Sequence, residues 1–306
     1  MFVLLGYVVM CLVFGTTFLT IKIGIEDGMP PFLFAGLRFF IAGALILSVL
    51  FCRRQLQRYS FKEYREMAWL GFLMTTIPFA ALYWAEQYVP SGLAALLVAT
   101  APVFTTIIGI YTGQMRFHWY VVAGLTLGIA GTALIVGVTP NTAEFTGSHA
   151  YISKAAIVLA ECAFAVGAIR SKKIMGKVSP SAFNGFQMIF ASVGLFVLSL
   201  IFENTGGVAF SSASLLALFY LAIVASIFAS NIYYWLVKET NATFPTTWTY
   251  VAPVIAMLVG AIFLQEKISL STIAGGAGVL FGIILLNWQT WEKVLDRKGK
   301  KEVPLQ

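Results

Sequence analysis

Ten stretches of about 20 mostly apolar residues limit the folds open to this 306-residue chain more than any other feature. A helix needs roughly 20 apolar residues to cross the hydrocarbon core of a bilayer. Lipid offers no partner for backbone polar groups, and runs this long do not alternate as barrel strands do, so we expect helices. The predicted spans are Phe2–Gly24, Pro31–Phe51, Met67–Tyr88, Ser91–Tyr111, Phe117–Val138, Tyr151–Ile169, Ser181–Phe202, Ser214–Val237, Thr243–Leu264 and Leu270–Trp288.

The composition points to the lipid bilayer as the solvent of this chain. Hydrophobic residues make up 59% of the sequence and charged residues 11%, whereas a soluble domain carries about 25% charged residues. The net charge of +7 invites a nucleic-acid interpretation. We reject it, because the basic residues lie in short runs between apolar spans, as in membrane proteins.

The basic residues also predict the orientation in the membrane. Sixteen of the twenty follow even-numbered spans, and three lie at the opposite ends of the spans. Because basic loops stay on the cytoplasmic side, we expect both termini in the cytoplasm and the chain in the cell (inner or cytoplasmic) membrane. The sixteen are Arg53, Arg54, Arg58, Lys62, Arg65, Arg116, Arg170, Lys172, Lys173, Lys177, Lys238, Lys293, Arg297, Lys298, Lys300 and Lys301.

An internal repeat relates the two halves of the chain. Tyr83-Trp84 and the unit Ala-Pro-Val at Pro102 recur as Tyr234-Trp235 and the unit at Pro253, with 234 − 83 and 253 − 102 both equal to 151. Five spans per repeat is an odd number, so the second half must enter the membrane from the opposite face. The predicted fold is an all-α membrane protein with ten transmembrane helices in two inverted five-helix repeats, residues 2–138 and 151–289, followed by a basic cytoplasmic tail, 290–306.

Four motifs carry a resemblance to a known family. They are Phe14-Gly-Thr-Thr-Phe, Pro31 to Arg38, the two Ala-Pro-Val units and Gln265-Glu266-Lys267. With the repeat, they make the chain resemble the drug/metabolite transporter superfamily and, within it, the EamA-like ten-span family, over about residues 3–289. The resemblance implies transport of metabolites or drugs through a central cavity formed by spans 1–4 and 6–9, with spans 5 and 10 outside it. The family often has an acidic residue after span 4, where this chain has Met115 and Arg116.

Arg38 and Glu161 are the two charges most clearly within predicted spans. Their positions along the helices place them roughly 10 and 15 Å below the same outer face. Charge inside a membrane usually marks a substrate pathway or a pair, so we expect both to face the cavity and to interact. A purely structural pair is the alternative, and a lone Glu161 could also carry a proton.

Several in-span aromatic and amide side chains are further cavity candidates. The aromatic residues could instead form an interfacial belt, which fits positions deep within span 9 poorly, and the amides could instead bridge helices. The candidates are Trp84, Trp235, Trp248, Tyr250, Asn184, Gln187 and Asn231.

Pro102 and Pro253 are expected to break spans 4 and 9, either as paired hinges around a central site or as static kinks. Gly124-xxx-Gly128 and Gly278-xxx-Gly282 give spans 5 and 10 small-residue faces for close packing. We interpret these faces as structural, and a homodimer contact through them as a weaker alternative.

The sequence offers no Ser/His/Asp set, metal-ligand spacing or Gly-rich phosphate loop, so we expect no enzyme activity, no metal site and no cofactor. The predicted function is secondary active transport, as an exporter, of a small-molecule substrate: an organic metabolite or drug moved by alternating access. The alternative is a membrane channel or passive facilitator. A channel would usually show a charged ring or a filter sequence, and neither is visible.

Overall fold

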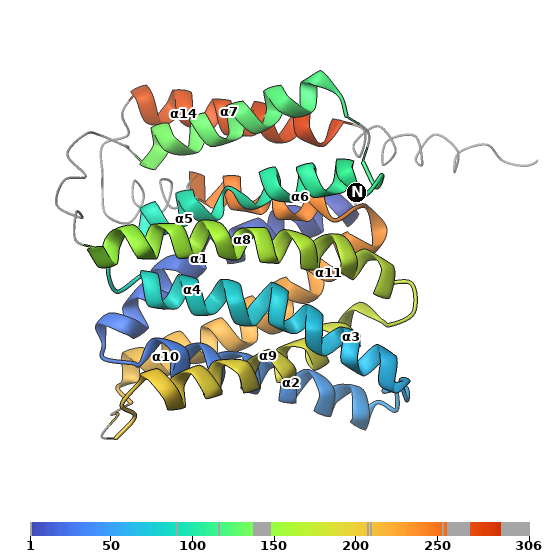
Figure 1. Cartoon of the computed structure of the whole chain (residues 1–306), viewed down its shortest axis with the longest axis vertical. Helices are drawn as coiled ribbons and strands as arrows, with labels where there is room; N and C mark the ends of the chain where they lie inside the picture. Colours follow the sequence, from blue (N-terminus) through green and yellow to red (C-terminus); the bar gives the residue numbers. More distant parts are fainter. Residues whose placement is uncertain are drawn as a thin grey trace, which may run out of the picture.

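The computed structural model describes residues 2–89, 91–115, 117–136, 148–206, 208, 210–252, 254–255 and 270–288. Over these residues the regular structure is helical, and the helices lie side by side in layers (Figure 1). The elements are α1 (Phe2–Glu26), α2 (Pro31–Cys52), α3 (Phe61–Gly71), η1 (Phe72–Thr76), α4 (Ile77–Ala85), α5 (Ser91–Val98), α6 (Ala101–Tyr111), α7 (Trp119–Val136), α8 (Ser148–Ile174), α9 (Pro180–Phe202), α10 (Ser212–Phe219), η3 (Tyr220–Ala229), α11 (Ser230–Glu239), α12 (Thr243–Thr246) and α14 (Leu270–Leu286), where η1 and η3 are π-helical.

Seven helical stretches of the described chain are long and apolar enough to cross a bilayer. They correspond to the predicted spans 1–4 and 6–8, and shorter apolar helices, Trp119–Leu134 and Ile273–Leu286, lie within the predicted spans 5 and 10. The third helical stretch begins at Phe61 rather than at Met67. The reason is local: the Ser60 hydroxyl accepts from the Glu63 N–H while the Glu63 carboxylate accepts from the Ser60 N–H, which is a capping box.

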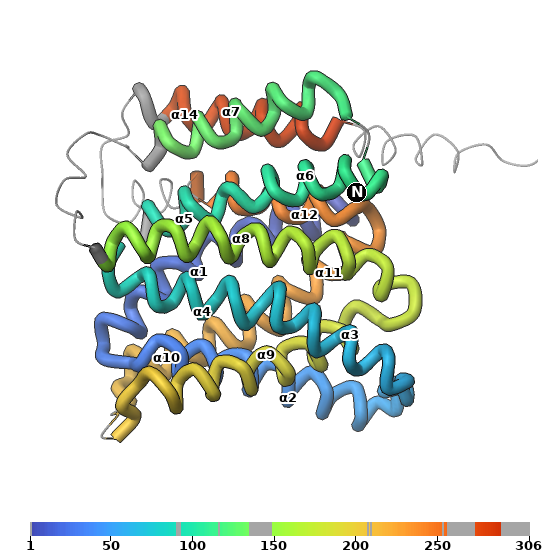
Figure 2. Tube along the Cα trace, viewed as in Figure 1, coloured from blue at the N-terminus to red at the C-terminus, as the bar shows by residue number. Residues whose placement is uncertain are grey.

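The outermost layer consists of α7 and α14, which lie side by side at one end of the molecule in Figures 1 and 2. Glycines allow this close approach. A Cβ added to Gly282 would lie 2.7 Å from the Gly124 carbonyl oxygen, and one added to Gly124 would lie 2.8 Å from the Gly282 carbonyl oxygen. The glycine faces predicted as packing surfaces therefore face each other within one chain.

At the opposite end of the layers, α2 packs along α9 (Figure 1). Here too a glycine sets the distance, because a Cβ on Gly43 would lie 2.9 Å from the Gly185 carbonyl oxygen. The helices between these two outer pairs line the central cavity described below, together with α2 and α9.

Two helical stretches contain π-helical turns where hydropathy alone predicts uninterrupted α-helix. In the first, η1 separates α3 from α4 just before Pro78, whose ring removes a backbone donor. In the second, η3 separates α10 from α11, and the Ser230 hydroxyl donates to the Ala225 carbonyl at 3.1 Å. Such turns often occur at functional sites.

Pro102 stands at the start of α6, after an interruption of the helix at residues 99–100. Proline is tolerated in the first turn of a helix, where its missing N–H has no intrahelical partner. The Thr100 hydroxyl donates to the Leu97 carbonyl at 2.7 Å and so satisfies one of the groups freed by the break. Pro253 lies outside the described residues.

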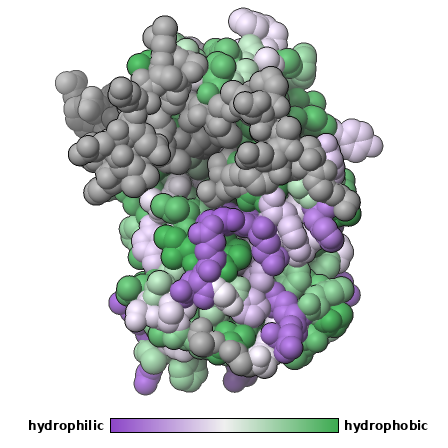
Figure 3. Space-filling view, turned by 90° about the vertical axis from the view of Figure 1, so that its left-hand side faces the viewer, coloured by the Kyte–Doolittle hydropathy of each residue, from purple (hydrophilic) through white to green (hydrophobic). Residues whose placement is uncertain are grey.

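Figure 3 shows hydrophilic residues among apolar ones on the side of the bundle that it presents. Carboxylates cap two helices at their N-termini. The backbone N–H groups of Phe32 and Leu33 donate to the Glu203 carboxylate at 2.6 and 2.9 Å. Asp27 accepts from the Ser211 hydroxyl and from the Ser214 N–H. The Ser211 hydrogen bond is the main reason that the pKa of Asp27 is lowered, so this cap persists to lower pH than a free aspartate would allow.

Candidate functional site

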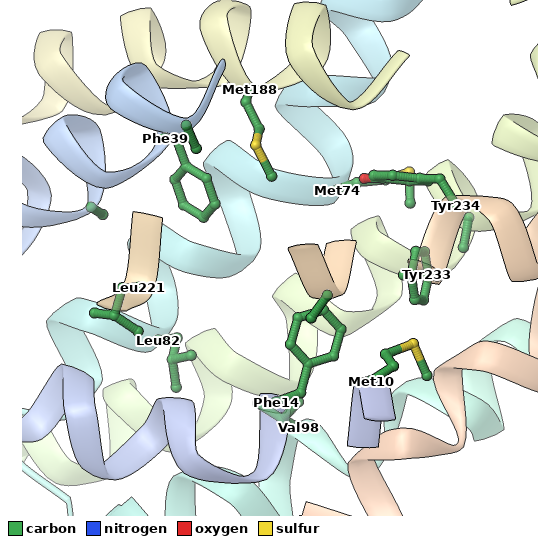
Figure 4. Close-up of a cluster of buried hydrophobic side chains, with 14 of the residues drawn as sticks. Met10, Phe14, Phe39, Met74, Leu82, Val98, Met188, Leu221, Tyr233 and Tyr234 are labelled. Atoms are coloured by element: carbon green, nitrogen blue, oxygen red, sulfur yellow. The ribbon is translucent and has the colours of Figure 1, made fainter. Parts of the chain in front are cut away.

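A cavity lies between the helices at the centre of the bundle, and the space inside it that a water-sized sphere can occupy is about 90 Å³. Its lining comes from α1, α2, η1, α4, α5, α8, α9, α11 and residues 248–249. Among the described helices, α7 and α14 contribute nothing to it. Figure 4 shows the apolar part, where Phe14, Phe39, Met74, Met188 and Tyr233 converge from different helices.

Arg38 is held in the cavity wall by neutral partners. Its side chain is 2% exposed; Nε donates to the Ser226 hydroxyl at 2.8 Å and Nη1 to the Tyr83 hydroxyl at 3.0 Å. The guanidinium also lies over the rings of Phe39 and Phe79, 4.8 and 5.0 Å from their centroids. Both contacts lie in the range of a cation–π interaction.

Glu161 of α8 lines the same cavity and is 5% exposed. The predicted ion pair with Arg38 is not formed: among the described residues, the only ion pair within 4.0 Å joins Lys22 and Glu26. The physical reason is that Arg38 already has Ser226 and Tyr83 within hydrogen-bond distance. Guanidinium and carboxyl thus contribute to the cavity as separate groups.

The buried amides Asn184 and Gln187 connect Thr75 of η1 to Ser226, the hydrogen-bond partner of Arg38. The Thr75 hydroxyl donates to Gln187 Oε1 at 2.7 Å, and Gln187 Nε2 donates to Asn184 Oδ1 at 3.4 Å. Asn184 Nδ2 donates to the Ser226 carbonyl at 3.1 Å, beside the hydroxyl that accepts from Arg38. Hydrogen bonds therefore link η1, α9, η3 and α2 around one side of the cavity, with Gln187 itself in the lining.

Trp248 is in the lining, with its ring centroid 4.7 Å from that of Phe14. Gln187 is the other aromatic or amide candidate in the lining, and the structure places the remaining ones outside it: Trp84, Trp235, Tyr250, Asn184 and Asn231. Tyr250 packs beside α7, where a Cβ on Gly128 would lie 2.7 Å from its ring. The ring of Trp235 covers Gly6 of α1.

Trp84 packs against Tyr88, with a centroid distance of 5.4 Å, beyond the part of α4 that lines the cavity. The Asn231 amide donates to the Ile227 carbonyl of its own helical stretch at 2.6 Å. These two positions thus lie on other faces of helices that do line the cavity.

Ser226, Ser230 and Tyr233 belong to the site and were not among the sequence candidates. The sequence does contain a pattern that could have indicated them. Their spacing of four and then three residues puts three polar side chains on one face of an otherwise apolar helical stretch. Tyr233 is 4% exposed, and its hydroxyl has no hydrogen-bond partner among the described residues. The hydroxyl is therefore available to a bound solute.

Comparison with known proteins adds independent findings. The EamA-like transporter family model matches residues 1–137 and 153–288. The chain is 26% identical over 286 residues to the uncharacterized transporter YoaV of Bacillus subtilis, covering 92% of this chain and 96% of the relative. It is 29% identical over 281 residues to the uncharacterized inner membrane transporter YedA of Escherichia coli K12, covering 90% and 87%. A solved crystal structure shares the fold, with a TM-score of 0.74 at 19% identity over 94% of this chain and 97% of the other.

Proposed function

This chain belongs to the EamA-like transporter family, and we propose that it is a secondary transporter that carries a small organic solute through the central cavity by alternating access. The observation that supports the proposal is the cavity itself. Its lining is mostly apolar and aromatic, and it includes the polar side chains of Arg38, Glu161 and Gln187. Binding sites for small molecules are mostly apolar with a few placed polar groups. This lining suits a solute with both polar and apolar parts.

The contacts between helices support ten membrane spans in two inverted repeats. α2 packs along α9 and α7 along α14, and these are the second and fifth spans of each half. The π-helical turns η1 and η3 both fall in the third span of a half, and Phe72–Thr76 moved by the repeat offset of 151 gives 223–227, within η3. Pairs of equivalent elements meeting each other are what a pseudo-twofold axis in the membrane plane produces.

Two lysines at equivalent positions of the two halves make the same kind of hydrogen bond, and we assign these two contacts a role in the transport cycle. Lys22 Nζ donates to the Glu86 carbonyl at 2.6 Å, at the end of α4. Lys172 Nζ donates to the Val237 carbonyl at 2.7 Å, near the end of α11. The offsets are 172 − 22 = 150 and 237 − 86 = 151, so the same contact recurs at opposite ends of the bundle. Each ammonium ties the first span of a half to the last carbonyls of its third span.

In alternating access, one of these two lysine hydrogen bonds would break while the other remains, so that the solute site opens to one side of the membrane at a time. We include Pro102 in the moving parts, because the interruption before α6 gives span 4 a place to bend. Pro253 is its proposed counterpart in the second half. Export is the proposed direction.

Counterflow separates this proposal from a channel or passive facilitator. A metabolite panel is first screened for compounds that raise the melting temperature of the purified protein. In liposomes preloaded with the unlabelled hit, a carrier should transiently accumulate the labelled hit above its equilibrium level, with a saturable rate. Non-saturating flux without accumulation would favour a channel or a pore-like passive facilitator.

We expect both termini in the cytoplasm, and impermeant thiol reagents test this topology. In a background with Cys11, Cys52 and Cys162 replaced by Ser, Asn204→Cys should react in intact cells. Arg58→Cys should react only after permeabilisation, because the basic loops are expected inside. Both positions are exposed in the structure. The opposite labelling would contradict the proposed orientation.

A homodimer is a further proposal for the assembly. The glycines Gly124 and Gly282 are already occupied by the contact between α7 and α14. A dimer would therefore use another surface, such as the apolar side chains that α7 and α14 expose: Val122, Leu134, Ile273 and Phe281.

A further inference from the structure

A second groove lies away from the central cavity, between the start of α3 and the end of α8. Each side contributes residues spaced by three, one and three positions, which places them on one helical face. From the α3 side these are Lys62, Arg65, Glu66 and Trp69; from the α8 side they are Arg170, Lys173, Ile174 and Lys177.

The groove has a large excess of positive charge. Five of its lining residues are cations and one, Glu66, is an anion, which leaves an excess of four. Glu63 stands nearby, and its carboxylate is engaged by Ser60. No ion pair or hydrogen bond of the five cations occurs among the described residues within the usual distances. An excess of four positive charges converging on one groove indicates a site for an anionic ligand.

The next turn of the same helix shows what kind of anion fits. Trp69, in the groove, stacks on Phe72 with a centroid distance of 5.8 Å, and both rings face outward with 48% and 43% of their surface exposed. The exposed face of this helix therefore changes from cations to aromatic rings toward the membrane interior. A ligand that matches this order has an anionic head and an apolar tail.

We propose that this groove binds the phosphate headgroup of an anionic phospholipid of the adjacent leaflet, with the acyl chains running over Trp69 and Phe72. Lys and Arg provide the charge, and Trp suits the boundary between headgroups and hydrocarbon. A further feature favours a phosphate there: α8 and α3 pack against each other, so the two cationic faces are held together. The groove shares no lining residue with the central cavity.

Native mass spectrometry of the purified protein in detergent tests the proposal with phosphatidylglycerol as the probe. Wild-type protein should retain phosphatidylglycerol in preference to phosphatidylcholine, which has a phosphate but no net charge. The double variant Arg65→Gln/Arg170→Gln should bind it roughly 30-fold more weakly, about fivefold for each cation removed near the surface. The matched control is Arg53→Gln/Arg58→Gln, which removes two exposed cations of the α2–α3 loop outside the groove.

Three results would overturn the proposal. If Arg53→Gln/Arg58→Gln weakened phosphatidylglycerol binding as much as Arg65→Gln/Arg170→Gln, the overall positive charge of this side rather than the groove would attract the lipid. Equal retention of phosphatidylcholine would remove the selectivity for anionic headgroups. Displacement of phosphatidylglycerol by millimolar inorganic phosphate would assign the groove to a soluble anion. The melting temperatures of all variants without added lipid check that the fold is intact, and Trp69→Ala provides a second variant, expected to weaken lipid but not phosphate binding.

Discussion

Replacing Arg38 with Gln is expected to abolish most transport, lowering the initial rate of uptake at least tenfold in liposomes. The guanidinium donates to the hydroxyls of Ser226 and Tyr83 and contacts the rings of Phe39 and Phe79. Hydrogen bonds to charged groups contribute about 1.5–3 kcal/mol each in proteins, although those between membrane helices average only about 0.6 kcal/mol. The shorter amide cannot keep both partners, and the cavity loses its cation.

Arg38→Lys is the matched control, because it keeps the positive charge but loses the planar guanidinium with its several N–H donors in a fixed geometry. We expect it to transport at an intermediate rate, since a single ammonium replaces contacts made by two nitrogens of one guanidinium. Melting temperatures in detergent separate a folding defect from a transport defect. Arg38→Gln transporting at more than half of the wild-type rate would contradict a role of this cation in the cavity.

The same assay examines the relation between Arg38 and Glu161. Because no ion pair within 4.0 Å joins them in the described structure, the effects of Arg38→Gln and Glu161→Gln should add in free energy, within about 0.5 kcal/mol. Strong coupling in the double variant would instead mean that the two groups meet in another conformation of the transport cycle.

The positions of the seven long apolar helices of the described chain could be predicted from the sequence, whereas the partner of Arg38 could not. The length of an apolar stretch predicts a membrane-spanning helix, because a helix needs about 20 apolar residues to cross the hydrocarbon core. The same reasoning gave Arg38 and Glu161 similar depths. Depth along a helix does not fix the direction of a side chain around it, and Ser226 and Tyr83 reach the guanidinium instead.

Trp248 and Tyr250 illustrate the same limit within one predicted span. Successive residues of a helix turn by about 100°, so two residues separated by two positions point in nearly opposite directions. Trp248 accordingly lines the cavity beside Phe14, while Tyr250 packs beside Gly128 of α7. Hydropathy did not distinguish them, because the whole predicted span is apolar. The π-helical turns escaped prediction for a related reason, since one extra residue in a turn leaves hydropathy unchanged.

Replacing Gly282 with Ala is expected to lower the melting temperature, because the new Cβ would lie 2.7 Å from both the Gly124 carbonyl oxygen and the Gly128 backbone nitrogen. These are backbone atoms, so relief requires α7 and α14 to separate. Overpacking of this kind typically costs about 1–3 kcal/mol, whereas Ala in place of Gly within a helix favours folding by about 1 kcal/mol in water.

Gly276 of the same helix supplies the control, because a Cβ there meets no heavy atom of the described residues within 4 Å. Gly276→Ala shares the gain in helix propensity without a clash against the described residues, so it should leave the melting temperature unchanged or raise it. The difference between the two alanine variants therefore measures the close approach of α7 and α14 alone. Equal melting temperatures for the two variants would mean that these helices are not held together through their glycine faces, and the contact between the equivalent fifth spans would lose its place in support of the inverted repeat.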